Sequence, residues 1–145
     1  MSTFQTTREI PASPAEVFAA FEEPNRLAKW WGPDGFHNTF DICEFKPGGL
    51  WQFTMHGPEG TDYPNKSVFV EIEAARKVVI DHVSPPRFRL TVEFSLCAAG
   101  TLVTWVQAFE DPAVAAAVRH IVEPANEQNL NRLTAEVVAG AGRGA

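Results

Sequence analysis

The sequence predicts an α+β domain in which a curved antiparallel sheet of about six or seven strands wraps around a long C-terminal helix. Three observations predict this fold class. Short segments of alternating apolar and polar residues, separated by glycine- and proline-rich turns, fill the middle of the chain. Two short helical patterns follow the first strand. The only long helical pattern lies at the C-terminus, and its apolar stripe is too narrow to fold without a larger apolar surface.

The first part of the chain predicts one strand and two short helices. The strand is expected over Thr3–Ile10. A capping box then opens the first helix, because a serine precedes a proline at the first helical position and a glutamate lies three residues on, at Ser13, Pro14 and Glu16. The second helix is expected to stop at Gly32-Pro33 and carries three large apolar residues, Leu27, Trp30 and Trp31.

From residue 36 onward the pattern has a period of two, which predicts strands with one buried and one solvated face. The expected strands are 36–43, 50–55, 68–73, 77–83, 88–96 and 101–109. Strict alternation places Ile42 on the face of Phe40, and Glu71 on the face of Phe69. Because tight turns join these segments, they should form an antiparallel meander whose covered face meets the final helix.

The C-terminal region begins at Asp111-Pro112, a cap followed by a proline at the first helical position. We expect Pro124 to kink or restart this region, so that the final helix runs from Glu123 to Ala139. Its apolar stripe is Asn126, Leu130, Leu133 and Val137. Gly140 should end the helix and leave residues 140–145 frayed. Residues 1–145 are expected to form a single domain.

Composition and charge limit the function classes. Hydrophobic residues make up 45% of the chain, and its net charge of −6 is spread along it, which disfavours nucleic acid and anionic membranes as partners. No apolar stretch approaches the roughly 20 residues of a membrane span and no signal peptide is evident, so we expect a cytoplasmic protein. Cys43 and Cys97 should be buried free thiols, and the scattered histidines predict no metal site and no cofactor.

A curved sheet and a single helix often enclose more volume than their side chains fill, which predicts an apolar pocket. The residues expected to contact a ligand there are Trp51, Phe53, Met55, Tyr63, His82, Phe88, Leu90, Trp105, Gln107, Asn126, Leu130 and Leu133. The alternative is that the aromatic residues simply fill the core. For Asn126, a structural hydrogen bond to the sheet is the other interpretation.

Several motifs together resemble a known family. They are IPASPAEVF at 10–18, LAKWWGP at 27–33, FKPGG at 45–49, GPEG at 57–60 and DHVS at 81–84. On these motifs the chain is identified as a member of the family named for the activator of heat-shock-protein ATPase, also called polyketide-cyclase-like, within the SRPBCC superfamily. The resemblance implies the helix-grip (Bet v 1/START-like) fold, and family analogy suggests a homodimer. The superfamily places ligand carriers, cyclases and co-chaperone domains on one scaffold.

Three functions follow from these observations. The leading hypothesis is non-catalytic binding of a small hydrophobic or aromatic molecule. The second is a cyclase- or hydrolase-like enzyme, in which a histidine works with a glutamate whose pKa is raised by an apolar pocket; the candidates are His82 and Glu71. The third is a stress-response or co-chaperone-like interaction domain. The resemblance implies that the eukaryotic co-chaperones carry a separate N-terminal domain for chaperone contact. This sequence offers no residues for that domain, so we do not expect it to activate an ATPase. Between the first two functions, the sequence favours binding over catalysis.

Overall fold

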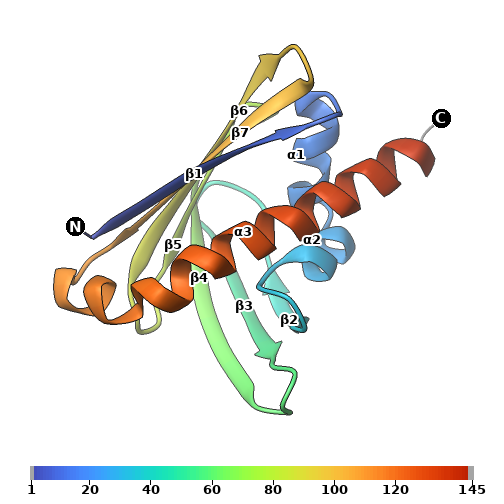
Figure 1. The fold of residues 1–145 in the computed structure, drawn as a ribbon. Coiled ribbons are helices and arrows are strands. Elements are labelled where there is room, and N and C mark those ends of the chain that lie inside the picture. Colours follow the sequence, from blue (N-terminus) through green and yellow to red (C-terminus); the bar gives the residue numbers. More distant parts are fainter. Residues whose placement is uncertain (1, 144–145) are drawn as a thin grey trace.

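The computed structural model describes residues 2–143, with side chains described for residues 2–140. Ten elements follow one another along the chain (Figure 1). They are β1 Thr3–Ile10, α1 Pro14–Glu22, α2 Pro24–Trp30, β2 His37–Cys43, β3 Gly49–His56, β4 Asp62–Glu73, β5 Lys77–His82, β6 Phe88–Cys97, β7 Gly100–Phe109 and α3 Pro112–Arg143.

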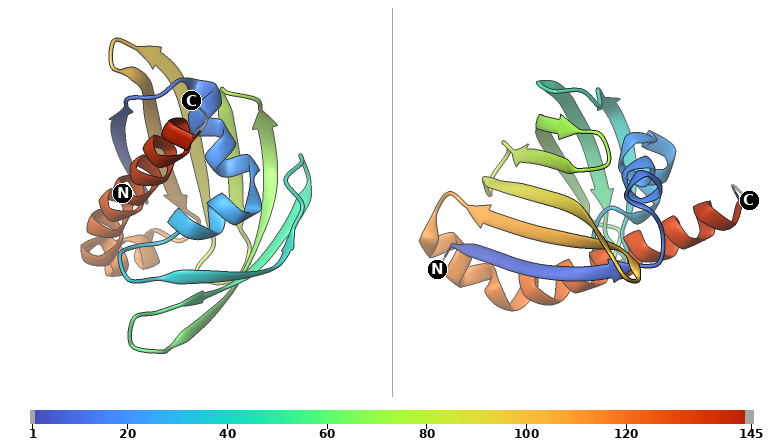
Figure 2. Two further views of the ribbon diagram at one scale, coloured as in Figure 1. Left: turned by 90° about the vertical axis from the view of Figure 1, so that its right-hand side faces the viewer. Right: turned by 90° about the horizontal axis from the view of Figure 1, so that it is seen from above.

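The strands form one seven-stranded antiparallel sheet in the order β1-β7-β6-β5-β4-β3-β2. From β2 to β7 each strand pairs with the next along the chain. The first strand, β1, pairs with the last, β7, so that β1 and β2 form the two edges of the sheet. The sheet curves strongly, with α3 crossing its concave side and α1 and α2 lying beside α3 (Figures 1 and 2). This arrangement confirms the predicted fold class, including the two short helices after the first strand.

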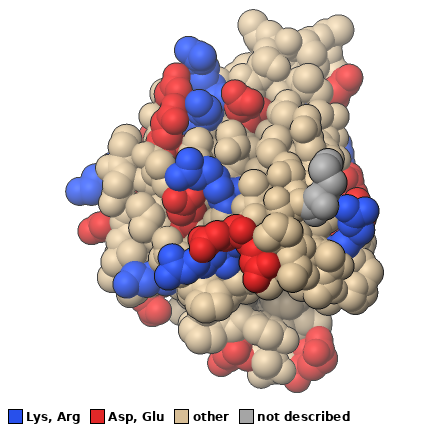
Figure 3. Space-filling view, turned by 90° about the vertical axis from the view of Figure 1, so that its left-hand side faces the viewer, with Lys and Arg blue, Asp and Glu red and all other residues tan. Residues whose placement is uncertain are grey.

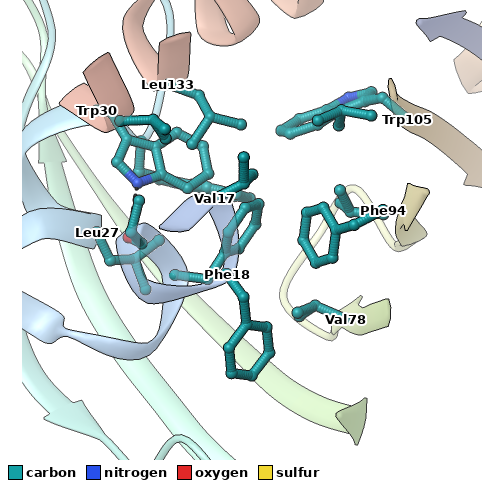
Figure 4. Packing of buried hydrophobic residues seen from close by; sticks show 14 of the residues in the cluster. Val17, Phe18, Leu27, Trp30, Val78, Phe94, Trp105 and Leu133 are labelled. Carbon is teal, nitrogen blue, oxygen red and sulfur yellow. Dashed lines mark hydrogen bonds between the residues drawn. The ribbon is translucent and has the colours of Figure 1, made fainter. Parts of the chain in front are cut away.

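An aromatic core lies where the helices meet the sheet. Trp51 stacks on Phe53 and on Phe69, with ring centroids 4.3 and 5.2 Å apart. Trp31 meets Trp51 edge-on at 4.9 Å. Figure 4 shows apolar side chains of the helices, among them Trp30 and Leu133, facing side chains of the sheet. Burial of these rings is the main favourable contribution to folding at this end of the molecule.

Two β-bulges shift the faces that strict alternation predicted. One lies between Phe40 and Ile42 in β2, and the other between Phe69 and Glu71 in β4. Ile42 therefore pairs with Gln52 and is exposed, and Cys43 pairs with the buried Trp51. Because a bulge adds one residue to one strand, every following side chain moves to the other face. The expectation that Ile42 shares the buried face was wrong for this reason.

The final helix also differs from the prediction. α3 is continuous from Pro112 to Arg143, so Pro124 does not restart it. Pro124 lies on the exposed side of α3, where water can hydrate the carbonyl that loses its partner. Gly140 does not end the helix, because residues 140–143 are helical. Residues 144 and 145 lie outside the described residues.

Gly140 has a packing role instead of ending the helix. Arg26 of α2 donates to the Glu136 carboxylate at 2.8 Å and to the Glu136 carbonyl at 3.3 Å. Its guanidinium lies so close to Gly140 that a Cβ there would collide with it. The glycine therefore makes room for the ion pair that joins α2 to α3.

Four further observations complete the fold. Strand β4 begins at Asp62, earlier than the predicted residue 68. Cys43 and Cys97 are free thiols, as predicted, but only half-buried, and burial raises the pKa of Cys43 to about 11. Among the described helices, none has the length and apolar character needed to cross a membrane. On the face shown in Figure 3, groups of both charge signs lie interspersed.

Candidate functional site

A pocket of about 460 Å³ opens between the concave face of the sheet and α3. Its volume falls within the range of small-molecule sites in proteins. The sheet contributes mainly large apolar side chains, which are Phe53, Met55, Tyr63, Phe88, Leu90 and Trp105. The middle of α3 contributes Ile121, Val122, Ala125, Asn126 and Asn129. The pocket is therefore predominantly apolar and aromatic, with a few polar groups.

The structure brings nine of the twelve predicted contact residues to this pocket. They are Phe53, Met55, Tyr63, His82, Phe88, Leu90, Trp105, Gln107 and Asn126. The other three, Trp51, Leu130 and Leu133, are fully buried in the core and do not line the pocket. These three side chains lie at the end of the sheet that meets α1 and α2, which is filled by side chains. The pocket occupies only the other end.

The segment from Trp31 to Phe36, which we call the wall loop, lines the pocket and was missed by sequence analysis. It contributes Trp31, Gly32, Pro33 and Phe36. The Gly32-Pro33 pair was interpreted only as a helix break. Gly32 has a φ of 98°, and a Cβ there would come within 2.8 Å of the Met55 methyl group. Glycine is therefore favoured by the backbone conformation, and a side chain there would also have to displace the tip of Met55.

Arg132 of α3 holds the wall loop in place. Its guanidinium donates to five backbone carbonyls at 2.8–3.3 Å, those of Lys29, Trp31, Gly32, Pro33 and Phe36. These include carbonyls at the end of α2, where cationic groups are favourable. The planar guanidinium can serve several acceptors at once. Arg132 does not lie on the apolar stripe of α3, which is why the sequence pattern did not single it out.

Asn129 provides the second attachment of this region. Its Oδ1 accepts from the Gly32 amide at 3.3 Å, and its Nδ2 donates to the Trp30 carbonyl at 2.9 Å. The side chain is buried, so both ends of the amide are satisfied within the protein. Asn129 and Arg132 together position the wall loop against α3.

His82 lies in the pocket wall with both ring nitrogens near hydrogen-bond partners. Its Nδ1 donates to the Pro86 carbonyl at 2.8 Å, and its Nε2 lies 2.5 Å from Asn65 Oδ1 and 3.4 Å from Ser84 Oγ. The ring stacks on Phe88, with centroids 4.6 Å apart. Burial, the largest effect, lowers the pKa of His82, although hydrogen bonds to the Pro86 and Ser84 backbone oppose it. The neutral ring is therefore favoured in the folded protein.

This lowered pKa predicts a pH dependence of stability. The unfolded chain takes up the His82 proton near pH 6.5, whereas the folded protein resists it until lower pH. The contribution of His82 to the free energy of unfolding is therefore present above about pH 6.5 and is lost as the pH falls below it. Urea unfolding of the wild type and of His82→Asn at about pH 7.5 and 5.5 measures this contribution. We expect the variant to lose less stability on acidification.

The control is His120→Gln, which removes an exposed histidine from α3. If His82→Asn and His120→Gln change the pH dependence of unfolding equally, burial of His82 is not the cause and this prediction is wrong.

Glu71 does not face the pocket. The bulge in β4 pairs it with Val79, on the outer side of the sheet, while the neighbouring Ile80 points to the core. The Lys77 ammonium lies 3.2 Å from the Glu71 carboxylate. Hydrogen bonds with Glu73 and Lys77 lower the pKa of Glu71. A glutamate facing an apolar pocket would instead have a raised pKa. The structure therefore does not bring Glu71 together with His82 in the pocket.

Gln107 and Asn126 form a polar contact between sheet and helix across the pocket wall. Asn126 Nδ2 donates to Gln107 Oε1 at 3.1 Å. Both interpretations of Asn126 made from the sequence therefore apply, since it binds the sheet and also lines the pocket. Within the described part of the chain, no three His, Cys, Asp or Glu side chains gather where they could hold a metal ion.

Comparison with known proteins adds the family and the fold. The family model for "Activator of Hsp90 ATPase homolog 1-like protein" matches residues 11–137. No curated protein matches the chain. A solved structure from Nitrosomonas europaea is 18% identical, covers 97% of this chain and 96% of its own, and has a TM-score of 0.87. A protein from Arthrobacter aurescens is 25% identical, with 95% and 87% covered and a TM-score of 0.87.

A third solved structure is the AHSA1 protein from Silicibacter pomeroyi. It is 21% identical, with 94% of this chain and 98% of that chain covered and a TM-score of 0.77. These likenesses extend over nearly the whole chain and agree with the seven-stranded sheet and the long C-terminal helix described above.

Proposed function

The chain belongs to the family of Activator of Hsp90 ATPase homolog 1-like proteins, and from this premise we propose that it binds a small hydrophobic or aromatic molecule in the pocket between the sheet and α3. The observation that carries the proposal is the open pocket of about 460 Å³ with its apolar and aromatic lining. A ligand there would remove apolar surface from water, which is favourable by roughly 25 cal/mol per Å².

The rim of the pocket supports the same proposal. Ile121 is 58% exposed and Tyr63 is 44% exposed, and both line the pocket. Large apolar side chains left in water beside a concave apolar surface are typical of a binding site. A ligand entering the pocket would cover part of both residues.

The competing functions have less support. Catalysis by His82 with Glu71 is not proposed, because Glu71 lies outside the pocket and is paired with Lys77. The family description names a chaperone ATPase activator, which keeps a stress-linked interaction domain as the alternative. The proposal includes a cytoplasmic location and a homodimer, and analytical ultracentrifugation of the purified protein would test the latter.

An amide-and-methyl NMR titration tests the pocket. The probes are a fatty acid, a phenol and a neutral aromatic ketone. We expect saturable shifts at lining residues such as Met55, Leu90 and Ile121, and smaller shifts at the core residue Leu130. No saturable shift with any probe would contradict the proposal and favour the interaction domain.

A charge at the pocket rim should weaken binding without unfolding the protein. Ile121→Asp places a carboxylate beside the apolar pocket, where a bound apolar molecule would desolvate it. We expect the dissociation constant of a probe found by the titration to rise at least about fivefold. Val138→Asp is the matched control, since Val138 is also an exposed residue of α3 but does not line the pocket. Equal affinities of the two variants would contradict the proposed site.

A further inference from the structure

We propose that the Gln107 side-chain amide selects the ligand by donating a hydrogen bond, so that the pocket prefers neutral aromatic molecules with an acceptor oxygen, such as a ketone, over hydrocarbons of the same shape. This inference rests on the proposed function and specifies the ligand class of that same site.

Gln107 lies on β7, opposite Leu90 of β6, and its side chain points to the concave face. The residue is only 9% exposed. Its Oε1 accepts from Asn126 Nδ2 at 3.1 Å, and this orientation directs Nε2 to other partners. Among the described residues, no hydrogen-bond partner is found for Gln107 Nε2. Protein atoms do not cover Gln107 Nε2 completely, because this nitrogen is absent from the fully buried side-chain atoms that lack a partner. Since Gln107 lines the pocket, we infer that Nε2 is accessible from the pocket.

Other polar groups of the pocket are partnered or covered, whereas the Tyr63 hydroxyl and Trp31 Nε1 have no hydrogen-bond partner among the described residues. Asn129 binds Trp30 and Gly32 through both ends of its amide. Asn65 donates to the Tyr63 carbonyl and lies against His82. Trp105 Nε1 has no partner in the described part of the chain, but protein atoms cover it completely. Gln107 therefore provides a donor on a largely buried side chain that a ligand can reach, and the Gln107→Met variant separates its role from those of Trp31 and Tyr63.

An empty pocket lets water accept from Gln107 Nε2, and a ligand must replace that water. A ketone oxygen restores the lost hydrogen bond, whereas a hydrocarbon leaves the donor buried without a partner.

The lining residues also limit the charge that a ligand can carry. No Lys or Arg is among the residues that line the pocket, and Asp62 lies among them, so a carboxylate ligand would lack a cationic partner.

The test compares 9-fluorenone with fluorene, which have the same planar ring system and differ by a carbonyl in place of a methylene group. Dissociation constants are measured by NMR titration for the wild type, Gln107→Met and Gln52→Met. The second substitution is the matched control, because Gln52 lies on β3 outside the pocket. We expect the wild type and Gln52→Met to bind the ketone roughly two- to tenfold more tightly than the hydrocarbon, and Gln107→Met to lose that preference.

A measurement on the wild type is independent of how well the variant folds. The Gln107 side-chain NH₂ signals, assigned by their loss in Gln107→Met, should shift downfield with fluorenone and not with fluorene. Fluorene binding with no preference for the ketone, or a preference that survives in Gln107→Met, would overturn this inference and leave the pocket as a binding site. Failure of fluorenone and fluorene to bind would overturn this inference, and the proposed function falls with it only if the fatty acid and the phenol also give no saturable shift.

Discussion

Replacing Leu133 with alanine is expected to lower the free energy of unfolding by about 2–5 kcal/mol. Leu133 is 0% exposed and belongs to the core cluster that joins α3 to α1, α2 and the sheet. Its truncation removes apolar contacts and leaves a cavity that the surrounding rings can fill only in part. Urea unfolding followed by tryptophan fluorescence measures the loss.

The control for this prediction is Val138→Ala on the same helix. Val138 is 45% exposed, so its truncation should change the free energy of unfolding by less than about 0.5 kcal/mol. Because Leu133 does not line the pocket, the affinity of folded Leu133→Ala for a pocket ligand should stay near that of the wild type. A variant that keeps its stability and loses affinity would show that Leu133 contacts the ligand.

Replacing Arg132 with methionine should destabilise the protein by about 2–4 kcal/mol and loosen the wall loop. The substitution leaves five carbonyls of residues 29–36 without their shared donor. Hydrogen bonds to a charged group are among the stronger ones in proteins, although water can replace part of the loss at a half-buried site. Urea unfolding gives the loss of stability, and hydrogen exchange of the Gly32 and Phe36 amides reports on the loop.

Two further variants separate geometry from charge. Arg132→Lys keeps the charge but lacks the planar fork, so we expect it to recover only part of the stability. Arg87→Met removes an exposed arginine and should have little effect on unfolding or on exchange in the wall loop. Unchanged exchange at Gly32 and Phe36 in Arg132→Met would contradict the role assigned to Arg132.

Local signals in the sequence predicted most of the elements. The capping box at Ser13 is formed in the structure, with hydrogen bonds in both directions between Ser13 and Glu16. The alternation in β6 places Leu90, Val92 and Phe94 on the buried face. These features depend on residues a few positions apart, so a pattern along the chain is sufficient to find them.

Prediction failed where contacts with another segment of the chain determine the local geometry. The bulge beside Glu71 depends on how β4 pairs with β5, and its effect is to turn a predicted catalytic side chain toward Lys77. The pattern within α3 alone predicted that Gly140 ends the helix. In the structure, the absence of a side chain at Gly140 leaves space for the guanidinium of Arg26 from α2. Helix and strand periodicities carry no information about such partners.

The candidate site shows the same division. The alternation of side chains along β3, β6 and β7 predicted four ligand contacts, which are Phe53, Phe88, Leu90 and Gln107. All four line the pocket. The apolar stripe of α3 does not show which of its residues pack in the core and which line the pocket. For this reason Leu130 and Leu133 were predicted to contact the ligand, although both are fully buried in the core. The wall loop was missed because its position depends on Arg132 and Asn129, nearly a hundred residues away in the sequence.

By itself, the sequence determined the order of the elements, the fold class and the apolar character of the concave face, because capping, turns and periodicity act within a few residues. Only the tertiary structure decided which apolar side chains pack against each other and which remain around an open volume. That outcome depends on the curvature of the sheet, on two bulges and on the attachment of the wall loop to α3. Each of these results from contacts between separate segments, and the attachment of the wall loop joins residues 99 positions apart. Their combined geometry leaves the pocket at one end of the sheet.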